Sequence, residues 1–427
     1  MDKVFPIKKG VACQLKWTWN TVRLMEATSA CCHRVEPIPL NIDDFDNFHN
    51  DPVWVSHREM QLQGKFPQQG CQYCERIEAQ GGTSDRMLHL NEKNVYPPEL
   101  DTDPEAVRTT PRILEVFLNN ACNMSCIYCD ESNSTRIQKE NEKFGHIVPG
   151  VPFNEELPLR NIISVVPRTN RYQEVVEKFF GYLGNNYHHL RRLQVLGGEP
   201  FYQKEFFRLV DFVCQNKNPE LKLNIVSNLK VSKKVLEEFM ENMKAALIDR
   251  RIARVDLTAS IDCFGPEQEY VRHGMDLEQW KENFEYMLSH KWLYVSINNT
   301  ITSMTIKTMP ELLEYINEKK KTRHIHHAFG IVDFRPYFHP GIMGPGFFDK
   351  DFEKIISLMS GDEKWDVINR NYMTGIQKAI NSYPEDMQQQ YYLRQYLDEI
   401  DRRRSLNWRE VFPWLAEKLD KVDYVVQ

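Results

Sequence analysis

The sequence predicts an α/β protein, a partial (β/α)6 TIM-like barrel between a Cys-rich, mostly irregular N-terminal domain and a helical C-terminal extension. Short apolar runs alternate with amphipathic stretches over residues 111–335. Five of the ten cysteines lie in the first 74 residues, where little periodicity is present. Beyond a Pro- and Gly-rich bend at 336–346, charged helical patterns continue to residue 427. We therefore expect domains at 1–95, 111–335 and 336–427.

Charge and hydropathy exclude two classes of partner. The 427 residues include 54 Lys and Arg against 60 Asp and Glu, which gives a formal net charge of −6 and does not favour nucleic acid. No run reaches the roughly 18 apolar residues of a membrane span, and the N-terminus has no apolar signal segment. We therefore expect a cytoplasmic protein without a membrane partner. Because cytosolic thiols stay reduced, the cysteines predict metal binding rather than disulfides.

The N-terminal domain, residues 1–95, is punctuated by prolines, and only Ser56–Gln63 has a helical pattern. A segment this irregular needs another source of stability, which metal bound by its cysteines would supply. The Pro-rich, acidic stretch from Tyr96 to Thr110 predicts a linker to the next domain.

The central domain is expected to contain six strands and five helices. The strands are predicted near Ile113–Leu118, Arg192–Leu196, Leu221–Val226, Val255–Ser260, Val295–Ile301 and His326–Val332. The helices are predicted at about Tyr172–Leu183, Lys204–Cys214, Lys233–Leu247, Leu277–Leu288 and Met309–Asn317. Six strands with intervening helices favour a partial barrel over a closed eight-stranded one. The polar insertion from Glu131 to about Arg168 predicts a loop or lid beside the first strand.

The C-terminal extension contains a basic run, Arg402, Arg403 and Arg404. Adjacent residues point in different directions around a helix, so we interpret this run as part of a solvated helix face.

The strongest motif is Cys122-Asn-Met-Ser-Cys126-Ile-Tyr-Cys129, directly after the first predicted strand. Three thiolates suit soft iron or zinc. A structural zinc site needs a fourth ligand, and the next Cys or His in the sequence is His146. An Fe–S cluster held by three Cys instead keeps one iron free for another ligand, as a catalytic cluster requires.

This triplet resembles the cluster motif of the radical S-adenosylmethionine (radical SAM) superfamily, in which an aromatic residue precedes the last Cys, as Tyr128 does here. The resemblance implies a catalytic [4Fe–4S] cluster on Cys122, Cys126 and Cys129. It also implies that SAM is bound and reductively cleaved to a 5′-deoxyadenosyl radical, which abstracts hydrogen from the substrate. A reductant such as flavodoxin or ferredoxin would supply the electron.

The motif Gly197-Gly198-Glu199-Pro200 follows the second predicted strand and resembles the family's GGEP motif, which binds the amino group of SAM. Glycines allow close backbone approach, and a carboxylate complements an ammonium. The alternative is an ordinary turn between a strand and a helix.

Polar residues at later strand ends resemble the family positions that bind the ribose or carboxylate of SAM. Because short polar residues also cap helices, capping is the alternative for each. They are Ser227, Asn228, Ser260, Asp262 and Asn298.

The N-terminal cysteines resemble the single-cluster Twitch form of the SPASM arrangement, which implies an auxiliary [4Fe–4S] cluster. Cys13, Cys71 and Cys74 are the expected ligands, with either Cys31 or Cys32 as the fourth. Four thiolates suit zinc equally well, so a zinc site is the alternative. In most relatives the auxiliary domain follows the barrel, whereas here it precedes the barrel.

The Twitch/SPASM resemblance implies a peptide or protein side chain as substrate, with an amino sugar or nucleotide as the alternative. A non-catalytic zinc-binding interaction protein is the competing function, and nothing like a cobalamin-binding domain supports methyl transfer. Cys214 is expected in the core and Cys263 is expected to be buried, although a thiol at this strand end could also donate hydrogen to a radical. We expect His324, His326 and His327 to be packing or substrate-contact residues.

Overall fold

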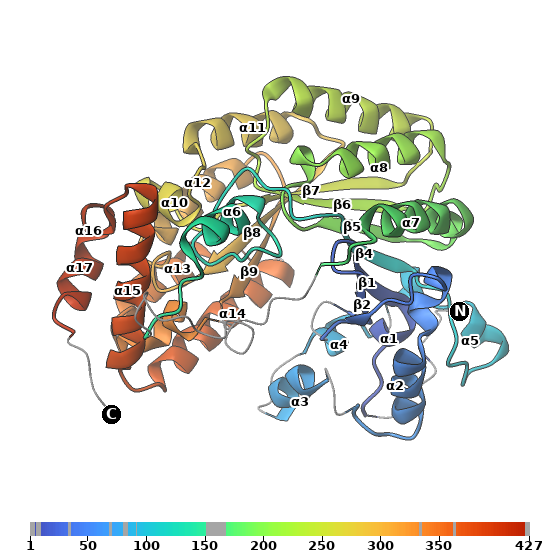
Figure 1. The fold of residues 1–427 in the computed structure, drawn as a ribbon, viewed down its shortest axis with the longest axis horizontal. Coiled ribbons are helices and arrows are strands. Elements are labelled where there is room, and N and C mark those ends of the chain that lie inside the picture. Colours follow the sequence, from blue (N-terminus) through green and yellow to red (C-terminus); the bar gives the residue numbers. More distant parts are fainter. Residues whose placement is uncertain are drawn as a thin grey trace. The chain divides into compact units, whose positions relative to one another are not determined.

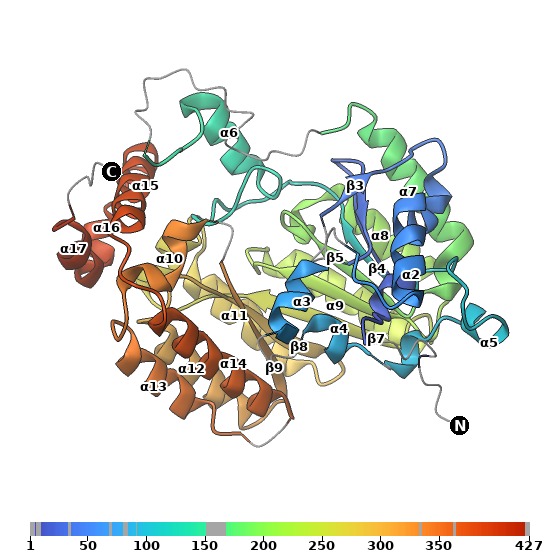
Figure 2. The same ribbon diagram turned by 90° about the horizontal axis from the view of Figure 1, so that it is seen from below.

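The structure is a computed structural model of the chain, drawn in Figures 1 and 2. It describes residues 5, 10–32, 36–67, 71–79, 84–90, 92–150, 168–332, 335–361 and 364–422. The chain divides into two compact units. The first unit comprises residues 1–120, 166–225 and 237–255, and the second comprises 121–165, 226–236 and 256–427. The fold is mixed α/β, and most of its paired strands run parallel.

The first unit is built on strands in the order β3-β2-β1-β4-β5-β6. These are β1 (Trp19–Arg23), β2 (Thr28–Ala30), β3 (Ile38–Pro39), β4 (Ile113–Phe117), β5 (Arg192–Leu196) and β6 (Lys222–Ser227). β1 pairs in parallel with β4, and Trp19 to Arg23 lie opposite Ile113 to Phe117. The expectation of a mostly irregular N-terminal segment is therefore wrong for its described residues. Trp19, Thr21 and Val22 favour extended backbone, and pairing with an apolar strand far along the chain fixes it.

The helices of the first unit come mainly from amphipathic stretches of the sequence. They are α1 (Leu15–Thr18), α2 (Pro52–Leu62), α3 (Gln72–Ala79), α4 (Asp85–Leu88), α5 (Glu99–Thr102), α7 (Tyr172–Asn186), α8 (Lys204–Gln215) and α9 (Lys233–Ile248). α2 begins at Pro52 because the Asp51 side chain accepts a hydrogen bond from the Val53 amide at 2.9 Å. α7 and α8 lie beside β4 and β5 and bury their Val, Leu and Phe side chains (Figures 1 and 2).

The second unit has three parallel strands and a set of C-terminal helices. The strands are β7 (Arg254–Ser260), β8 (Tyr294–Ile301) and β9 (Ile325–Ile331). The helices are α6 (Thr135–Phe144), α10 (Pro266–Val271), α11 (Leu277–Ser289), α12 (Met309–Lys320), α13 (Asp349–Leu358), α14 (Lys364–Asn381), α15 (Met387–Arg404), α16 (Trp408–Val411) and α17 (Pro413–Leu419). α12 and α14 pack against β9 (Figure 2), and Val295, Ile297 and Ile301 face the core from alternate positions of β8.

The six strands and five helices predicted for residues 113–332 are all present, with ends within three residues of the predicted ones. The C-terminal extension is helical as predicted. The insertion at 131–168 differs from the expected loop, because α6 occupies residues 135–144; its residues 151–167 lie outside the described structure. No helix among the described residues is both long and apolar enough to cross a membrane. The division into domains at 1–95, 111–335 and 336–427 stays a prediction.

Candidate active site

The three cysteines of the triplet lie in one loop, residues 121–134, which we call the cluster loop. It follows β4 in the chain and ends at α6. The Ser134 side chain caps α6 by accepting a hydrogen bond from the Ile137 amide, and it also donates to the Met124 carbonyl at 2.7 Å. Thr135 accepts a hydrogen bond from the Cys122 amide at 3.3 Å. The start of the helix therefore holds the first half of the loop.

A buried polar network supports the other half of the cluster loop. The Asp262 carboxylate is fully buried and forms a bidentate ion pair with Arg272, with two N···O distances of 2.8 Å. The Tyr128 hydroxyl donates to the same carboxylate at 2.6 Å, and the Thr300 amide donates at 2.8 Å. Asp262 therefore anchors the aromatic residue of the motif, and its predicted contact with SAM stays a prediction.

Side chains from the C-terminal helices bind the carbonyl groups of the cluster loop. Arg404 donates to the Ser125 carbonyl at 2.8 Å, and Tyr396 donates to the Ile127 carbonyl at 2.6 Å. Arg335 donates to this second carbonyl at 3.3 Å. Ile127 itself is fully buried in a hydrophobic cluster with residues of α10 and α13–α17. The loop is thus fixed through its backbone from the side of the C-terminal helices.

The interpretation of the basic run as a solvated face is wrong for two of its three residues. The Arg403 side chain is 0% exposed and that of Arg404 is 5% exposed, whereas Arg402 is 59% exposed. Arg403 pairs with Glu399 at 2.6 Å, and Arg404 pairs with Glu140 of α6 at 2.9 Å. The helix turns these two side chains toward α6 and the cluster loop, where carboxylates and carbonyls pair with them, although Nη1 of Arg403 has no hydrogen-bond partner among the described residues.

The predicted strand-end residues Ser227 and Asn228 lie in a turn of the second unit. The Ser227 hydroxyl accepts a hydrogen bond from the Leu229 amide at 2.9 Å, and the Asn228 carbonyl oxygen accepts one from the Lys230 amide at 2.8 Å. Both residues therefore have the turn role that was the alternative. Asn228 also reaches the cluster loop, because its amide nitrogen is 3.0 Å from the Asn123 side-chain oxygen and 4.0 Å from the Cys122 sulfur.

Ser260 and Asn298 are register partners on β7 and β8. Ser260 is buried and Asn298 is half-buried. Cys263 is fully buried, as predicted, and its amide donates to Gln268 at 2.9 Å. Cys214 is only half-buried, so the prediction that it lies in the core is wrong. His327 packs as predicted, with its ring stacked on Phe329 at 4.0 Å.

The chemistry of the triplet suits a cluster that three thiolates ligate. Burial raises the pKa of Cys129 well above its usual range, and Asp130, Cys126 and Cys122 raise it further. Burial likewise raises the pKa of Cys126. A bound metal would supply the positive charge that makes these thiolates favourable. Within the described ranges, no three His, Cys, Asp or Glu side chains converge at metal-binding separations. The donor set therefore fits iron or zinc by composition, and metal binding would require the thiols to turn toward a common point.

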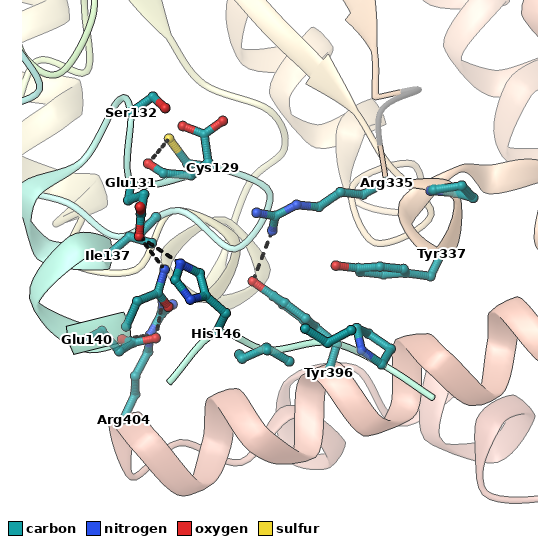
Figure 3. Close-up of a pocket in the computed structure, with 16 residues that line it drawn as sticks. Cys129, Glu131, Ser132, Ile137, Glu140, His146, Arg335, Tyr337, Tyr396 and Arg404 are labelled. Carbon is teal, nitrogen blue, oxygen red and sulfur yellow. Dashed lines mark hydrogen bonds and ion pairs between the residues drawn. The ribbon is translucent and has the colours of Figure 1, made fainter. Parts of the chain in front are cut away.

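A cavity of about 550 Å³ lies beside Cys129 in the second unit (Figure 3). Figure 3 shows Glu131 and His146 on one side of the cavity and Arg335 and Tyr337 on the other. Nε2 of His146 lies 3.0 Å from a carboxylate oxygen of Glu131. The insertion after the triplet therefore contributes part of the lining. The cavity combines acidic, basic and aromatic groups next to one of the predicted cluster ligands, so it is the candidate substrate pocket.

The first unit holds the predicted GGEP motif. Gly197 and Gly198 have φ angles of +82° and +55°, and a side chain at Gly197 would place its Cβ 2.7 Å from the Phe117 ring. Only glycine suits that position. Glu199 is 1% exposed, and its carboxylate accepts a hydrogen bond from the Phe201 amide at 3.2 Å at the start of the short helix Pro200–Tyr202. The turn role is therefore present, and the predicted SAM contact of residues 197–200 stays a prediction.

The five N-terminal cysteines, which we call the N-terminal thiol set, also belong to the first unit. They come from separate elements: Cys13 precedes α1, Cys31 and Cys32 follow β2, and Cys71 and Cys74 lie at the start of α3. Burial raises the pKa of Cys13 to about 12. A hydrogen bond from Cys32 and the ammonium of Lys16 hold the pKa of Cys31 well below its usual range. Cys31 is thus the thiol of this set beside the Lys16 ammonium, with its sulfur 3.1 Å from Nζ.

Sequence reasoning missed several residues that hold the site. Tyr396 and Arg335 carry no local pattern, because each acts on a loop more than 200 positions away in the chain. Arg404 was visible only as part of a basic run. Lys16 follows Cys13 by three positions, and a lysine so close to a predicted ligand is the signal that could have found it.

Residues 116–318 match the family described as the Radical SAM superfamily. No curated protein matches the chain. A solved structure described as native anSMEcpe with bound AdoMet and Kp18Cys peptide aligns with 16% identity and a TM-score of 0.35. The alignment covers 64% of this chain and 62% of that one, so this chain spans less than two thirds of that protein.

Proposed function

We propose that the chain is a radical SAM enzyme that cleaves SAM reductively at a [4Fe–4S] cluster held by Cys122, Cys126 and Cys129, which lie within the residues, 116–318, that match the Radical SAM superfamily. The cluster loop carries this proposal. Its three thiols lie within eight residues, and buried side chains fix the backbone around them. Three thiolates leave one iron open to the amino and carboxyl groups of SAM. When bound, the cluster would supply the electron for this cleavage, and hydrogen abstraction from the substrate would follow.

Within this proposal, the chain's own residues bind and orient. Glu199, with Gly197, Gly198 and Pro200, would bind the SAM amino group, and Ser227, Asn228, Ser260, Asp262 and Asn298 would line the ribose and carboxylate. Asp262 can do so only indirectly, since its oxygens already accept bonds from Arg272, Tyr128 and Thr300. We assign it to positioning of the cluster loop. The strands are proposed to form a partial (β/α)6 barrel.

For the substrate, we propose a peptide or protein side chain. The cavity beside Cys129 supports this class, because Arg335, Tyr337 and Glu131 could bind a carboxylate, a peptide group and an amine respectively. A reductant such as flavodoxin or ferredoxin supplies the electron, and the expected location is cytoplasmic.

The N-terminal thiol set is proposed to hold an auxiliary [4Fe–4S] cluster of the Twitch/SPASM type. Cys13, Cys71 and Cys74 are three of its ligands. For the fourth we favour Cys31 over Cys32, because Cys31 is 1% exposed and its sulfur is 3.1 Å from the Lys16 ammonium.

The test is anaerobic reconstitution with iron and sulfide, followed by reduction in the presence of SAM. We expect about eight iron atoms per chain, charge-transfer absorption of Fe–S clusters, and release of 5′-deoxyadenosine. Cys214→Ala is the matched control, because Cys214 belongs to neither thiol set and should leave all three readouts unchanged. A colourless protein that binds zinc and releases no 5′-deoxyadenosine would instead be a non-catalytic zinc protein.

A further inference from the structure

Lys16 places a buried ammonium group among the N-terminal thiols. The residue is 2% exposed and lies on α1, three positions after Cys13. Its Nζ is 3.1 Å from the Cys31 sulfur and 3.2 Å from Nδ1 of His57. The ammonium of α1 therefore contacts a thiol that follows β2 and a histidine of α2.

The surroundings hold this side chain in place. The Arg58 guanidinium donates to the Lys16 carbonyl at 2.7 Å and is itself fully buried. His57 is the neighbouring residue on α2, and it is also buried. Arg58 thus ties the backbone of Lys16 to α2, and His57, the residue before Arg58, contacts the ammonium group. Such a fixed side chain can act on a neighbouring group without the entropy cost of ordering a mobile lysine.

A buried ammonium is unfavourable unless negative charge accompanies it. The Cys31 sulfur, 3.1 Å from the ammonium, is the group of this set that can supply negative charge at hydrogen-bond distance when it ligates a cluster. A cluster with four thiolate ligands carries net negative charge, and that charge increases by one when the cluster accepts an electron. A fixed cation at hydrogen-bond distance from a ligating sulfur therefore stabilises the reduced state more than the oxidised state.

We propose that Lys16 is a positioning residue that donates a hydrogen bond to a ligating sulfur of the auxiliary cluster and thereby raises the reduction potential of that cluster. This inference rests on the auxiliary cluster proposed above. Lys16 would act on the cluster through this ligating sulfur, since Lys16 is not itself a metal ligand. The reaction affected is the uptake of one electron by the cluster from an external reductant.

The experiment is a redox titration of the full-length, reconstituted protein with dithionite and mediator dyes, followed by EPR. Added SAM changes the signal of the catalytic cluster, so the signal that SAM leaves unchanged reports the auxiliary cluster. Lys16→Met keeps the length of the side chain and removes its charge and donors. Loss of a charge-assisted hydrogen bond should lower the equilibrium constant for reduction by about 10- to 150-fold. At 59 mV per tenfold, this is a potential about 60 to 130 mV more negative.

Arg86→Met is the matched control. Arg86 is a buried cation of the same segment, but it donates to the Gly10 and Ala12 carbonyls and pairs with Glu78. This variant should be less stable than the parent without a change in potential. Lys16→Gln keeps one donor without the charge and should shift the potential by less than Lys16→Met. If Lys16→Met does not retain iron, the Gln variant decides the question.

Two results would overturn the inference, and they differ. In the first, both Lys16 variants hold about eight iron atoms per chain and have the reduction potential of the parent protein. Lys16 then does not affect the potential, although the auxiliary cluster is present. With about four iron atoms and zinc in the N-terminal thiol set of the parent protein, the auxiliary cluster itself is absent, and the role of Lys16 falls with it.

Discussion

The cluster loop and the N-terminal thiol set achieve a similar gathering of cysteines in opposite ways. In the cluster loop, eight consecutive residues supply three cysteines, and remote side chains bind the loop backbone. In the N-terminal thiol set, five cysteines come from three separate segments, and a buried lysine lies among them. The first arrangement fixes the backbone through remote side chains. The second places positive charge directly against sulfur.

This difference is consistent with the different tasks that we propose for the two sites. A site that must admit SAM needs an open ligand position and few protein donors at its sulfurs. A site that only carries or tunes an electron can be buried and surrounded by charge. Variants of the two regions should therefore differ in which properties they lose: iron content, SAM cleavage or stability.

The largest effect is expected for Cys126→Ala. Removing one of the three ligands leaves the catalytic cluster incomplete, so release of 5′-deoxyadenosine should stop, while the N-terminal thiol set should retain about four iron atoms. Iron analysis and chromatography of the reaction mixture measure both. Unchanged 5′-deoxyadenosine release would disprove the assignment of the triplet. Loss of all iron would show that the two sites depend on each other.

The next effect is expected for Asp262→Asn, which breaks the buried ion pair with Arg272 and weakens the bond to Tyr128. Removing one partner of a buried pair costs about 3–5 kcal/mol, because the other charge is left uncompensated. Chemical denaturation should show this loss of stability, and iron should be lost from the cluster loop before the N-terminal thiol set.

Asp351→Asn is the control for this variant. Asp351 pairs with Lys307 at 3.2 Å, and both side chains are more than 20% exposed. A pair of this kind contributes at most about 1 kcal/mol. Equal destabilisation by the two substitutions would mean that the Asp262 network does not support the cluster loop.

Local signals in the sequence predict part of the fold and of the site, and contacts between distant segments determine the rest. Elements with local signals are found correctly, such as β5 at Arg192–Leu196, where short apolar runs mark a buried strand. The triplet is also local. By contrast, β1 is missed because its apolar partner, β4, lies about 90 residues away. The supporting contacts of Tyr396 and Arg404 require a folded chain, since no spacing rule links α15 to the cluster loop.

A smaller effect is expected for Glu199, whose carboxylate both caps a turn and is proposed to bind the SAM amino group. Loss of a charge-assisted hydrogen bond should weaken SAM binding by about 10- to 150-fold in Glu199→Ala. Glu199→Gln keeps an oxygen that can accept from the Phe201 amide, so it should weaken SAM binding less. A SAM titration monitored by the EPR signal of the reduced cluster measures both. Parent-like SAM binding in both variants would leave Glu199 with the turn role alone.

The smallest effect is expected for Tyr396→Phe, which removes one of two donors to the Ile127 carbonyl. A neutral hydrogen bond contributes about 1 kcal/mol, and Arg335 still reaches this carbonyl at 3.3 Å, so the group is not left unsatisfied. We expect a loss of stability of about 1 kcal/mol or less, and faster removal of iron from the cluster loop by a chelator. Tyr383→Phe is the control, because Tyr383 is 53% exposed. If the two variants lose iron at the same rate, Arg335 suffices for the loop, and the contribution of α15 to the site reduces to Arg404 and the packing around Ile127.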